Sequence, residues 1–230
     1  MQKIKSMRSL SGLSSCFIWS VSASLVAVLL LGGQSTAIAA SAKKATAVLK
    51  TIPVRAWASK AGYARSQFGD GWGSIGNCDT RNYILIRDLT HLTYRSSPDC
   101  TVATGVLRDP YTDKTINFVR GVRTSTAVQI DHVVALSDSW QKGAQTLSYA
   151  TRVAMANDPL ELLAVDGPSN ESKSDSDAAN WLPPNHSYWC PYVARQIAVK
   201  AKYHLWMSTA EKARISQVLR SCPAQLVPTR

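Results

Sequence analysis

The chain has 230 residues, of which 26 are Lys or Arg and 15 are Asp or Glu, so its formal net charge at pH 7 is +11. The length fits a single domain behind a short leader, and no internal repeat indicates a repeat array. The positive charge favours polyanionic partners, namely nucleic acid, anionic wall polymers or lipid head groups, with solubility alone as the alternative explanation.

The first 40 residues have the order of a secretory signal peptide. Lys3, Lys5 and Arg8 form a basic start, residues 17–31 are mostly apolar, and small residues at 37–39 offer a cleavage site. An uncleaved membrane anchor is disfavoured, because serines interrupt an apolar stretch that is shorter than roughly 20 residues. Cys16 precedes the apolar run, which disfavours a lipoprotein. We predict a secreted protein without stable membrane association after cleavage, with a net charge of +8 (11 minus 3).

Beyond the leader, the chain has four cysteines: Cys78, Cys100, Cys190 and Cys222. An even number in an exported chain indicates two disulfides. Four cysteines can pair in three ways, and we favour the one in which both bridges are local, with 78 joined to 100 and 190 joined to 222. A zinc site is the less favoured alternative, because no two of these cysteines have the C-x-x-C spacing.

The first half of the exported chain mixes helical and strand patterns. Residues 41–69 are predicted to be an N-terminal helical segment that is broken near Pro53. After a glycine-rich loop, the run RNYILIRDLT at 81–90 fits either a helix or a strand. Residues 101–107 and 115–121 are rich in β-formers, and the RDPYTDK run between them has the composition of a turn. They predict an antiparallel hairpin.

The second half is mostly helical. Residues 125–136 begin as a further strand and pass into helix, and residues 137–157 are helical with a break at Gly143. A short apolar strand at 159–165 leads through a Gly-Pro turn into a polar run. A long helix spans 187–207, and Ser208 with Glu211 has the spacing of a capping box before a last helix. The fold class is therefore mixed α and β, with a small antiparallel element flanked by helices.

Asp131 and His132 stand side by side in an apolar run. Burying two titratable groups without partners is costly, so they are either a hydrogen-bonded structural pair or part of a site. Asn157 precedes the second short strand. Asn170 and Lys173 stand three apart, so on a helix they share one face. A helix that packs back on the strands would bring Asn170 to Asp131.

The order Asp131-His132, then Asn157, then NESKSD at 170–175 resembles the HNH nucleases. It is most similar to the secreted branch related to the DUF1524 and GmrSD C-terminal domains, and the runs CDTRNYILIRDL and GVLRDPYTDKTINFVRG add to the resemblance. The resemblance covers most of residues 70–222. It implies an α+β fold with a ββα-metal (HNH) core, an antiparallel hairpin, flanking helices and two disulfides. The nuclease domain would span 70–230.

The resemblance also implies a role for each matched residue. His132 would be the general base, since its ordinary pKa of about 6.5 suits proton transfer near neutral pH. Asp131 and Asn170 would give oxygen ligands to a divalent cation, Mg²⁺ first and Mn²⁺ or Ca²⁺ by the same logic. Asn157 is counted with the catalytic residues, where it would hold the loop that carries the histidine in place. Lys173 would contact a substrate phosphate.

These roles predict a secreted, metal-dependent, nonspecific endonuclease that hydrolyses phosphodiester bonds of DNA, with RNA as a further substrate. Asp175 matches the motif without an implied role. The alternative is a noncatalytic, disulfide-stapled exported module that binds nucleic acid or anionic wall polymers. A metallopeptidase is disfavoured, because no pair of histidines has ligand spacing. The sequence does not indicate strandedness, oligomeric state or any inhibitor protein.

Overall fold

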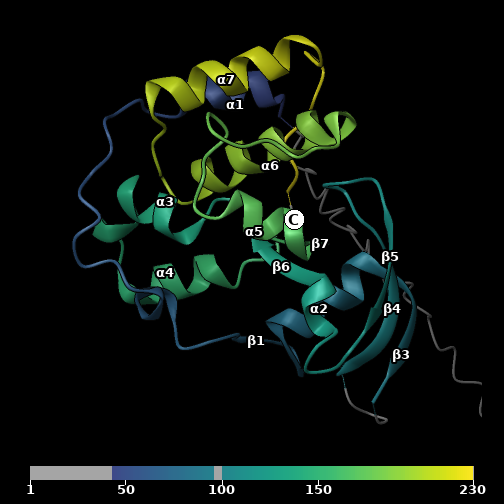
Figure 1. Cartoon of the computed structure of the whole chain (residues 1–230). Helices are drawn as coiled ribbons and strands as arrows, with labels where there is room; N and C mark the ends of the chain where they lie inside the picture. Colours follow the sequence, from purple (N-terminus) through teal and green to yellow (C-terminus); the bar gives the residue numbers. More distant parts are fainter. Residues whose placement is uncertain (1–42, 96–99, 230) are drawn as a thin grey trace, which may run out of the picture. The chain divides into compact units, whose positions relative to one another are not determined.

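Helices and short antiparallel strands follow one another along the chain in the computed structural model, which describes residues 43–95 and 100–229 (Figure 1). This mixture confirms the predicted α+β class. The predicted signal peptide at 1–40, with Cys16, lies outside the described residues. No helix within the described ranges is long and apolar enough to cross a membrane.

A three-stranded antiparallel sheet contains the predicted hairpin. Its strands, in spatial order, are β3 (Leu89–Tyr94), β4 (Val102–Arg108) and β5 (Thr115–Val119). In the turn between β4 and β5, one carboxylate oxygen of Asp109 accepts hydrogen bonds from Thr112. The other oxygen accepts from the backbone amide of Asp166. Asp109 is fully buried, so it fixes the hairpin turn against the strand that ends at Asp166.

The predicted strand, insertion, strand and helix order is also present. β6 (Val128–His132) pairs antiparallel with β7 (Leu162–Asp166), and α5 (Gly167–Lys173) follows directly. Asp166 caps α5 by accepting from the Ser169 amide. A Cβ at Gly167 would lie 2.0 Å from the carbonyl oxygen of Thr126. Only glycine therefore lets α5 start this close to the segment before β6.

Further helices and strands surround this ββα unit. The other α-helices are α1 (Ala45–Thr51), α2 (Thr80–Asp88), α3 (Leu136–Gln141), α4 (Tyr149–Ala156), α6 (Trp189–Lys202) and α7 (Thr209–Arg220). Single-turn 3₁₀ helices are η1 (Arg65–Phe68), η2 (Ser125–Ala127), η3 (Ala144–Thr146) and η4 (His186–Tyr188). The two-residue strands β1 (Ser74–Ile75) and β2 (Cys78–Asp79) form a small hairpin.

Two segments differ in detail from the predicted pattern. The ambiguous run at 81–90 is helix up to Asp88 and strand from Leu89, because Leu89 leaves the helical region and pairs with Leu107 of β4. The segment at 41–69 is helical only in α1 and in the single turn η1. Between them the chain runs along α3 and α4 without regular structure, as Figure 1 shows.

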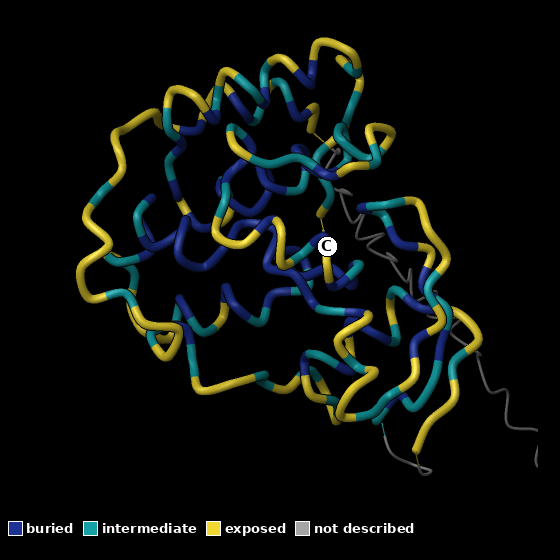
Figure 2. The backbone as a smooth tube through the Cα atoms, in the orientation of Figure 1, coloured by how far each residue is buried: buried dark blue, intermediate teal, exposed yellow. Residues whose placement is uncertain are grey.

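β6 and β7 lie between two parts of the hydrophobic core. Alternate residues of β7 face opposite sides: Leu162 and Ala164 pack with α2 and the three-stranded sheet, whereas Leu163 and Val165 pack with α1, α6 and α7. A strand that is buried on both faces is continuously apolar. A third cluster, around Trp140 and Met155, lies among α3, α4 and η1. β6 and β7 are accordingly buried along most of their length, whereas α5 has both buried and exposed residues (Figure 2).

The two favoured disulfides are confirmed. Cys78 pairs with Cys100, which joins β2 to the start of β4, and Cys190 pairs with Cys222, which joins the start of α6 to the end of α7. The zinc alternative for these cysteines is therefore wrong.

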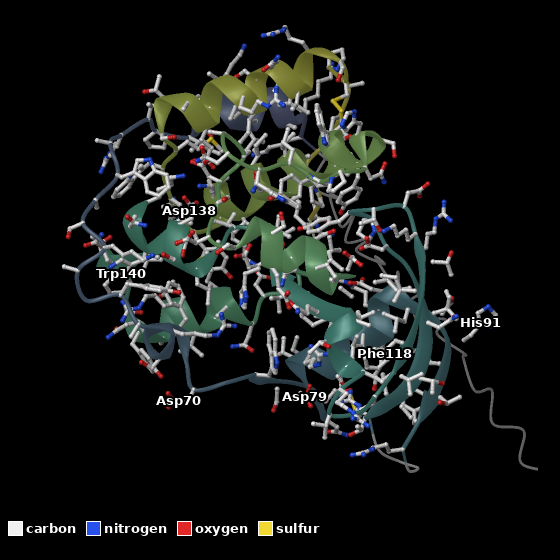
Figure 3. All side chains as sticks on the ribbon, in the orientation of Figure 1. Asp70, Asp79, His91, Phe118, Asp138 and Trp140 are labelled. Carbon is white, nitrogen blue, oxygen red and sulfur yellow. A yellow bond between two sulfur atoms is a disulfide. The ribbon has the colours of Figure 1, made fainter. Side chains whose placement is uncertain are left out.

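A fully buried cluster of five charges links α3, α6 and α7. The ammonium groups of Lys142 and Lys200 are each paired with Asp138 and Glu211, and Lys142 also reaches Asp177, at distances of 2.5–3.1 Å. Asp138 is labelled on α3 in Figure 3. Ser208 caps α7 as predicted, by accepting from the Glu211 amide, but the Glu211 carboxylate turns inward to the lysines. Lys200 is thus a core residue although it is a lysine on a helix with other basic residues.

Candidate active site

The end of β6, α5 and the chain segment around residues 60–65 enclose a cavity of about 640 Å³. Asp131, His132, Asn170 and Lys173 all line it. The helix α5 therefore packs back on β6 in the way that the motif spacing required. Hydrogen bonds across the cavity wall give each of these four side chains a defined position.

The Asp131 carboxylate is buried and accepts hydrogen bonds from two donors. Its Oδ1 accepts from Lys173 Nζ at 2.9 Å, and its Oδ2 accepts from the hydroxyl of Tyr111, which lies in the turn of the β4–β5 hairpin. Desolvation raises the pKa of Asp131, and the adjacent ammonium of Lys173 opposes this rise. The two donors thus hold a carboxylate at the cavity wall where burial alone would disfavour its charge.

Lys173 is placed differently from the predicted phosphate contact. Its side chain is fully buried, and Nζ donates to Asp131 and to the backbone carbonyl of His132, both at 2.9 Å. With these two acceptors the ammonium is directed at β6 and not at the open cavity. Lys173 fastens the end of α5 to the Asp131-His132 pair.

The imidazole of His132 is fixed by a hydrogen bond at one ring nitrogen and by stacking of one ring face. Its Nε2 lies 3.0 Å from the carbonyl oxygen of Ala156, and the ring stacks on Trp72 with centroids 5.8 Å apart and an interplanar angle of 5°. A carbonyl can only accept, so Nε2 carries the proton and Nδ1 keeps its lone pair. Burial lowers the pKa of His132 to about 3, with the charge of Arg65 as the next cause. The ring is therefore neutral at pH 7.

The Asn157 side chain forms hydrogen bonds that hold the segment next to Trp72. Its Oδ1 accepts from the Gly73 amide at 2.7 Å, and its Nδ2 donates to the Val153 carbonyl at 3.0 Å. The side chain makes no hydrogen bond to His132 among the described residues. Asn157 instead fastens residues 72–73 to the end of α4, beside the Ala156 carbonyl that holds the imidazole.

Asn170 belongs to a chain of amide hydrogen bonds. Its Nδ2 donates to Gln129 Oε1, and Gln129 Nε2 donates to Glu171 Oε1, both at 2.8 Å. Because the amide nitrogen is used in this way, the Oδ1 oxygen of Asn170 is the atom left for a ligand.

The donor set suits a hydrated hard cation better than a soft one. Asp131 contributes carboxylate oxygens with lone pairs beyond those used by Lys173 and Tyr111, and Asn170 contributes a neutral oxygen to the same cavity. Within the described ranges, no three His, Cys, Asp or Glu side chains form a metal-binding group. Two oxygen ligands with several waters is the arrangement that Mg²⁺ commonly takes.

Asp175, which matched the motif without an implied role, lies on the cavity rim. Its Oδ2 is 3.0 Å from Lys60 Nζ and also accepts from the Ser137 hydroxyl. Hydrogen bonding to Lys60 lowers the pKa of Asp175. The residue thus connects α5 to the segment that precedes η1.

A second cavity, of about 140 Å³, lies against His132. Arg65, His132 and Leu136 line both cavities, and Phe68, Gly69, Gly71, Trp72 and Ala156 complete the smaller one. Sequence reasoning missed Trp72, Tyr111, Arg65 and Lys60. Each lies 20 or more residues from Asp131-His132 in the sequence, and none has a local pattern that indicates the contact.

Comparisons with known proteins show which family the chain resembles. Residues 79–218 match the family model described as "GmrSD restriction endonucleases, C-terminal domain". The chain is also 34% identical over 184 residues, which cover 79% of it and 86% of the relative, to an "Uncharacterized secreted protein" of Arthroderma benhamiae. No solved structure matches the chain.

Proposed function

Since the chain belongs to the family of GmrSD restriction endonuclease C-terminal domains, we propose that it is an exported, metal-dependent endonuclease that hydrolyses phosphodiester bonds. The observation that carries the proposal is the placement of a neutral, rigidly held imidazole in one cavity wall with Asp131 and Asn170. Phosphodiester hydrolysis needs a base for the attacking water and positive charge at the phosphate.

His132 is the general base in this proposal. The proton on Nε2 is held by the Ala156 carbonyl, so Nδ1 takes the proton from the attacking water. A bound phosphodiester is an anion, and its charge offsets that of Arg65 beside the ring. Binding of substrate therefore raises the pKa of His132 from its low value in the free protein toward the range useful for catalysis.

The neighbouring residues orient the base and the ligand oxygens. Lys173 holds both the Asp131 carboxylate and the His132 carbonyl, and Asn157 holds the segment whose Trp72 stacks on the imidazole. We assign Lys173 and Asn157 as positioning residues. A divalent cation held by Asp131 and Asn170, most simply Mg²⁺ with Mn²⁺ or Ca²⁺ as alternatives, would supply positive charge to the phosphate and the leaving oxygen.

The substrate is nucleic acid, with DNA first and RNA second. The exported part has a net charge of +8 and no sequence-reading motif, which supports binding through phosphates and cleavage without base preference. Export is supported by the predicted signal peptide, by the two disulfides and by the relative that is named a secreted protein.

Plasmid cleavage by the oxidised protein tests the proposal. We expect nicking and linearisation of supercoiled DNA in Mg²⁺ or Mn²⁺, loss of cleavage with excess EDTA, and recovery when the metal is restored. DNA binding without cleavage under every metal condition would instead support the noncatalytic module. Cleavage that persists in EDTA would contradict the metal-dependent mechanism.

A further inference from the structure

Residues 53–73, which we call the N-terminal arm, precede the segment that matches the family model. The arm is fixed along α3 and α4 by hydrogen bonds. The Ala58 amide donates to the Gln141 carbonyl at 2.9 Å, and the Arg152 guanidinium donates to both the backbone and the side-chain oxygen of Gln67. In Figure 1 the arm is the blue trace that passes α3 and α4. It is therefore an ordered part of this fold.

The arm forms one wall of the candidate active site. Lys60, Tyr63 and Arg65 line the large cavity, and the segment from Phe68 to Trp72 lines the small one. The family-matched segment contributes Asp131, His132, Asn170 and Lys173 from the other side. The cavity is thus shared between residues inside and outside the matched segment.

Arg65 differs from the other basic residues of the cavity. Four basic side chains line it, and three of them have protein acceptors: Lys60 pairs with Asp175, Lys173 pairs with Asp131, and Arg81 donates to the Val128 and Ser125 carbonyls. Arg65 is exposed, and its guanidinium has no hydrogen bond or ion pair to any described residue. Its five N–H donors are therefore available to a ligand in the cavity.

The position of Arg65 defines the chemistry of that ligand. Arg65 and His132 each line both cavities, and after burial the charge of Arg65 is the next cause that lowers the pKa of the imidazole that we assign as the base. Lys173 already compensates the nearby carboxylate of Asp131, and Lys60 compensates Asp175. A guanidinium left without a carboxylate partner matches the two oxygens of a phosphate by bidentate hydrogen bonding.

We propose that Arg65 is a substrate-binding residue that holds the backbone phosphate next to His132, so that the N-terminal arm completes the nucleic-acid site. This inference rests on the proposed function, because it takes the scissile linkage to lie at His132. It assigns a binding role to a residue that the family-matched segment does not contain. The expected ligand is one phosphate of a DNA or RNA strand, recognised through its charge and its oxygens and not through a base.

Binding to a 20-base-pair duplex over a range of NaCl concentrations tests the proposal. The measurements use the full oxidised chain with His132→Gln, which prevents cleavage during titration. Arg65→Gln should weaken binding about ten- to hundredfold, because a charge-assisted contact is lost. The slope of log K against log salt should fall by about 0.9, as expected for one phosphate contact to a duplex. Arg65→Lys should recover the slope but only part of the affinity.

Arg214→Gln is the matched control. It removes the same charge from α7, where the Arg214 guanidinium donates to Gln217 and lies over the Trp189 ring, away from the residues that line the cavity. The control should leave the salt slope unchanged. Equal effects of Arg65→Gln and Arg214→Gln, or no effect of Arg65→Gln, would overturn the assignment of Arg65.

Cleavage by the proteins that retain His132 separates the two proposals. A chain that cleaves DNA, but whose Arg65→Gln variant keeps the parental KM and salt slope, would refute the role of Arg65 and leave the nuclease assignment intact. A chain that cleaves under no metal condition, yet binds DNA with an Arg65-dependent salt slope, would refute the nuclease assignment and support the phosphate contact.

Discussion

Replacing Lys173 by Met should destabilise the fold far more than replacing Lys60 by Met, although both lysines line the same cavity. Their ion pairs have almost the same length: Lys173 Nζ is 2.9 Å from Asp131, and Lys60 Nζ is 3.0 Å from Asp175. They differ in exposure. The side chains of the first pair are 1% and 5% exposed, and those of the second are 53% and 51% exposed.

The difference in exposure sets the expected free energies. Without Lys173, the Asp131 carboxylate stays buried with the Tyr111 hydroxyl, and the His132 carbonyl loses its donor. Breaking a buried pair in this way costs about 3–5 kcal/mol. Breaking an exposed pair costs about 0–1 kcal/mol. With a urea m-value of about 2 kcal/mol per molar, the unfolding midpoint should fall by about 1.5–2.5 M for Lys173→Met and by less than about 0.5 M for Lys60→Met.

Urea unfolding followed by tryptophan fluorescence, with disulfides intact and EDTA present, measures both midpoints. Lys173→Met combined with Asp131→Asn should recover much of the loss, because the double variant leaves no unpaired charge in the core. Equal midpoints for the two single lysine variants would refute the buried-pair assignment. That result would instead favour the role that the sequence predicted for Lys173, which is a contact with a substrate phosphate.

Three further predictions concern the histidine, its support and the disulfides. His132 has a folded pKa of about 3 against an unfolded value of about 6.5, so the unfolded chain binds an extra proton between these values. The free energy of unfolding should therefore fall as pH drops through this window. In EDTA, His132→Gln should reduce the slope of the free energy of unfolding against pH by about 1.4 kcal/mol per pH unit. An unchanged slope would contradict the assignment of a buried neutral imidazole. Asn157→Ala should lower kcat more than it raises KM, because the segment that carries Trp72 loses a hydrogen bond. Asn157→Asp retains an acceptor for the Gly73 amide and should keep more of the activity. Steady-state cleavage kinetics measure both variants, and an equal loss of activity in the two would count against a positioning role for Asn157. Reduction should lower the melting temperature, since bridges with sequence separations of 22 and 32 residues contribute about 3–4 kcal/mol each in the chain-entropy model, and an unchanged calorimetric transition would refute that contribution.

The sequence predicted those features that depend on local patterns. The β4–β5 hairpin follows from two β-rich runs around a turn, and the Ser208 cap follows from its spacing to Glu211. The order β6, β7 and α5 follows from Asp131-His132, the short apolar strand and the Gly-Pro turn. The favoured disulfide pairing joins cysteines that are near in sequence, where loop closure costs least.

The remaining features depend on contacts between distant segments. Lys173 has the same local sequence whether it faces a phosphate or a buried carboxylate, and only the packing of α5 on β6 decides between them. Lys200 is one of several basic residues on α6, yet it is buried because Asp138 and Glu211 lie beside it in the fold. Apart from the single turn η1, the arm has no regular structure that a periodic pattern could reveal, so the placement of Arg65 at the site could not be predicted.

The rate of DNA cleavage by His132→Gln tests the central claim most directly. Glutamine keeps an N–H for the Ala156 carbonyl but has no basic nitrogen, so the fold and DNA binding should be retained. His186→Gln is the control, because His186 is an exposed histidine that does not line the cavity. We predict a loss of about 10²–10⁴-fold in the single-turnover rate for His132→Gln at unchanged DNA affinity, and no loss for the control. A His132→Gln protein that is folded and cleaves DNA at the parental rate would contradict the account.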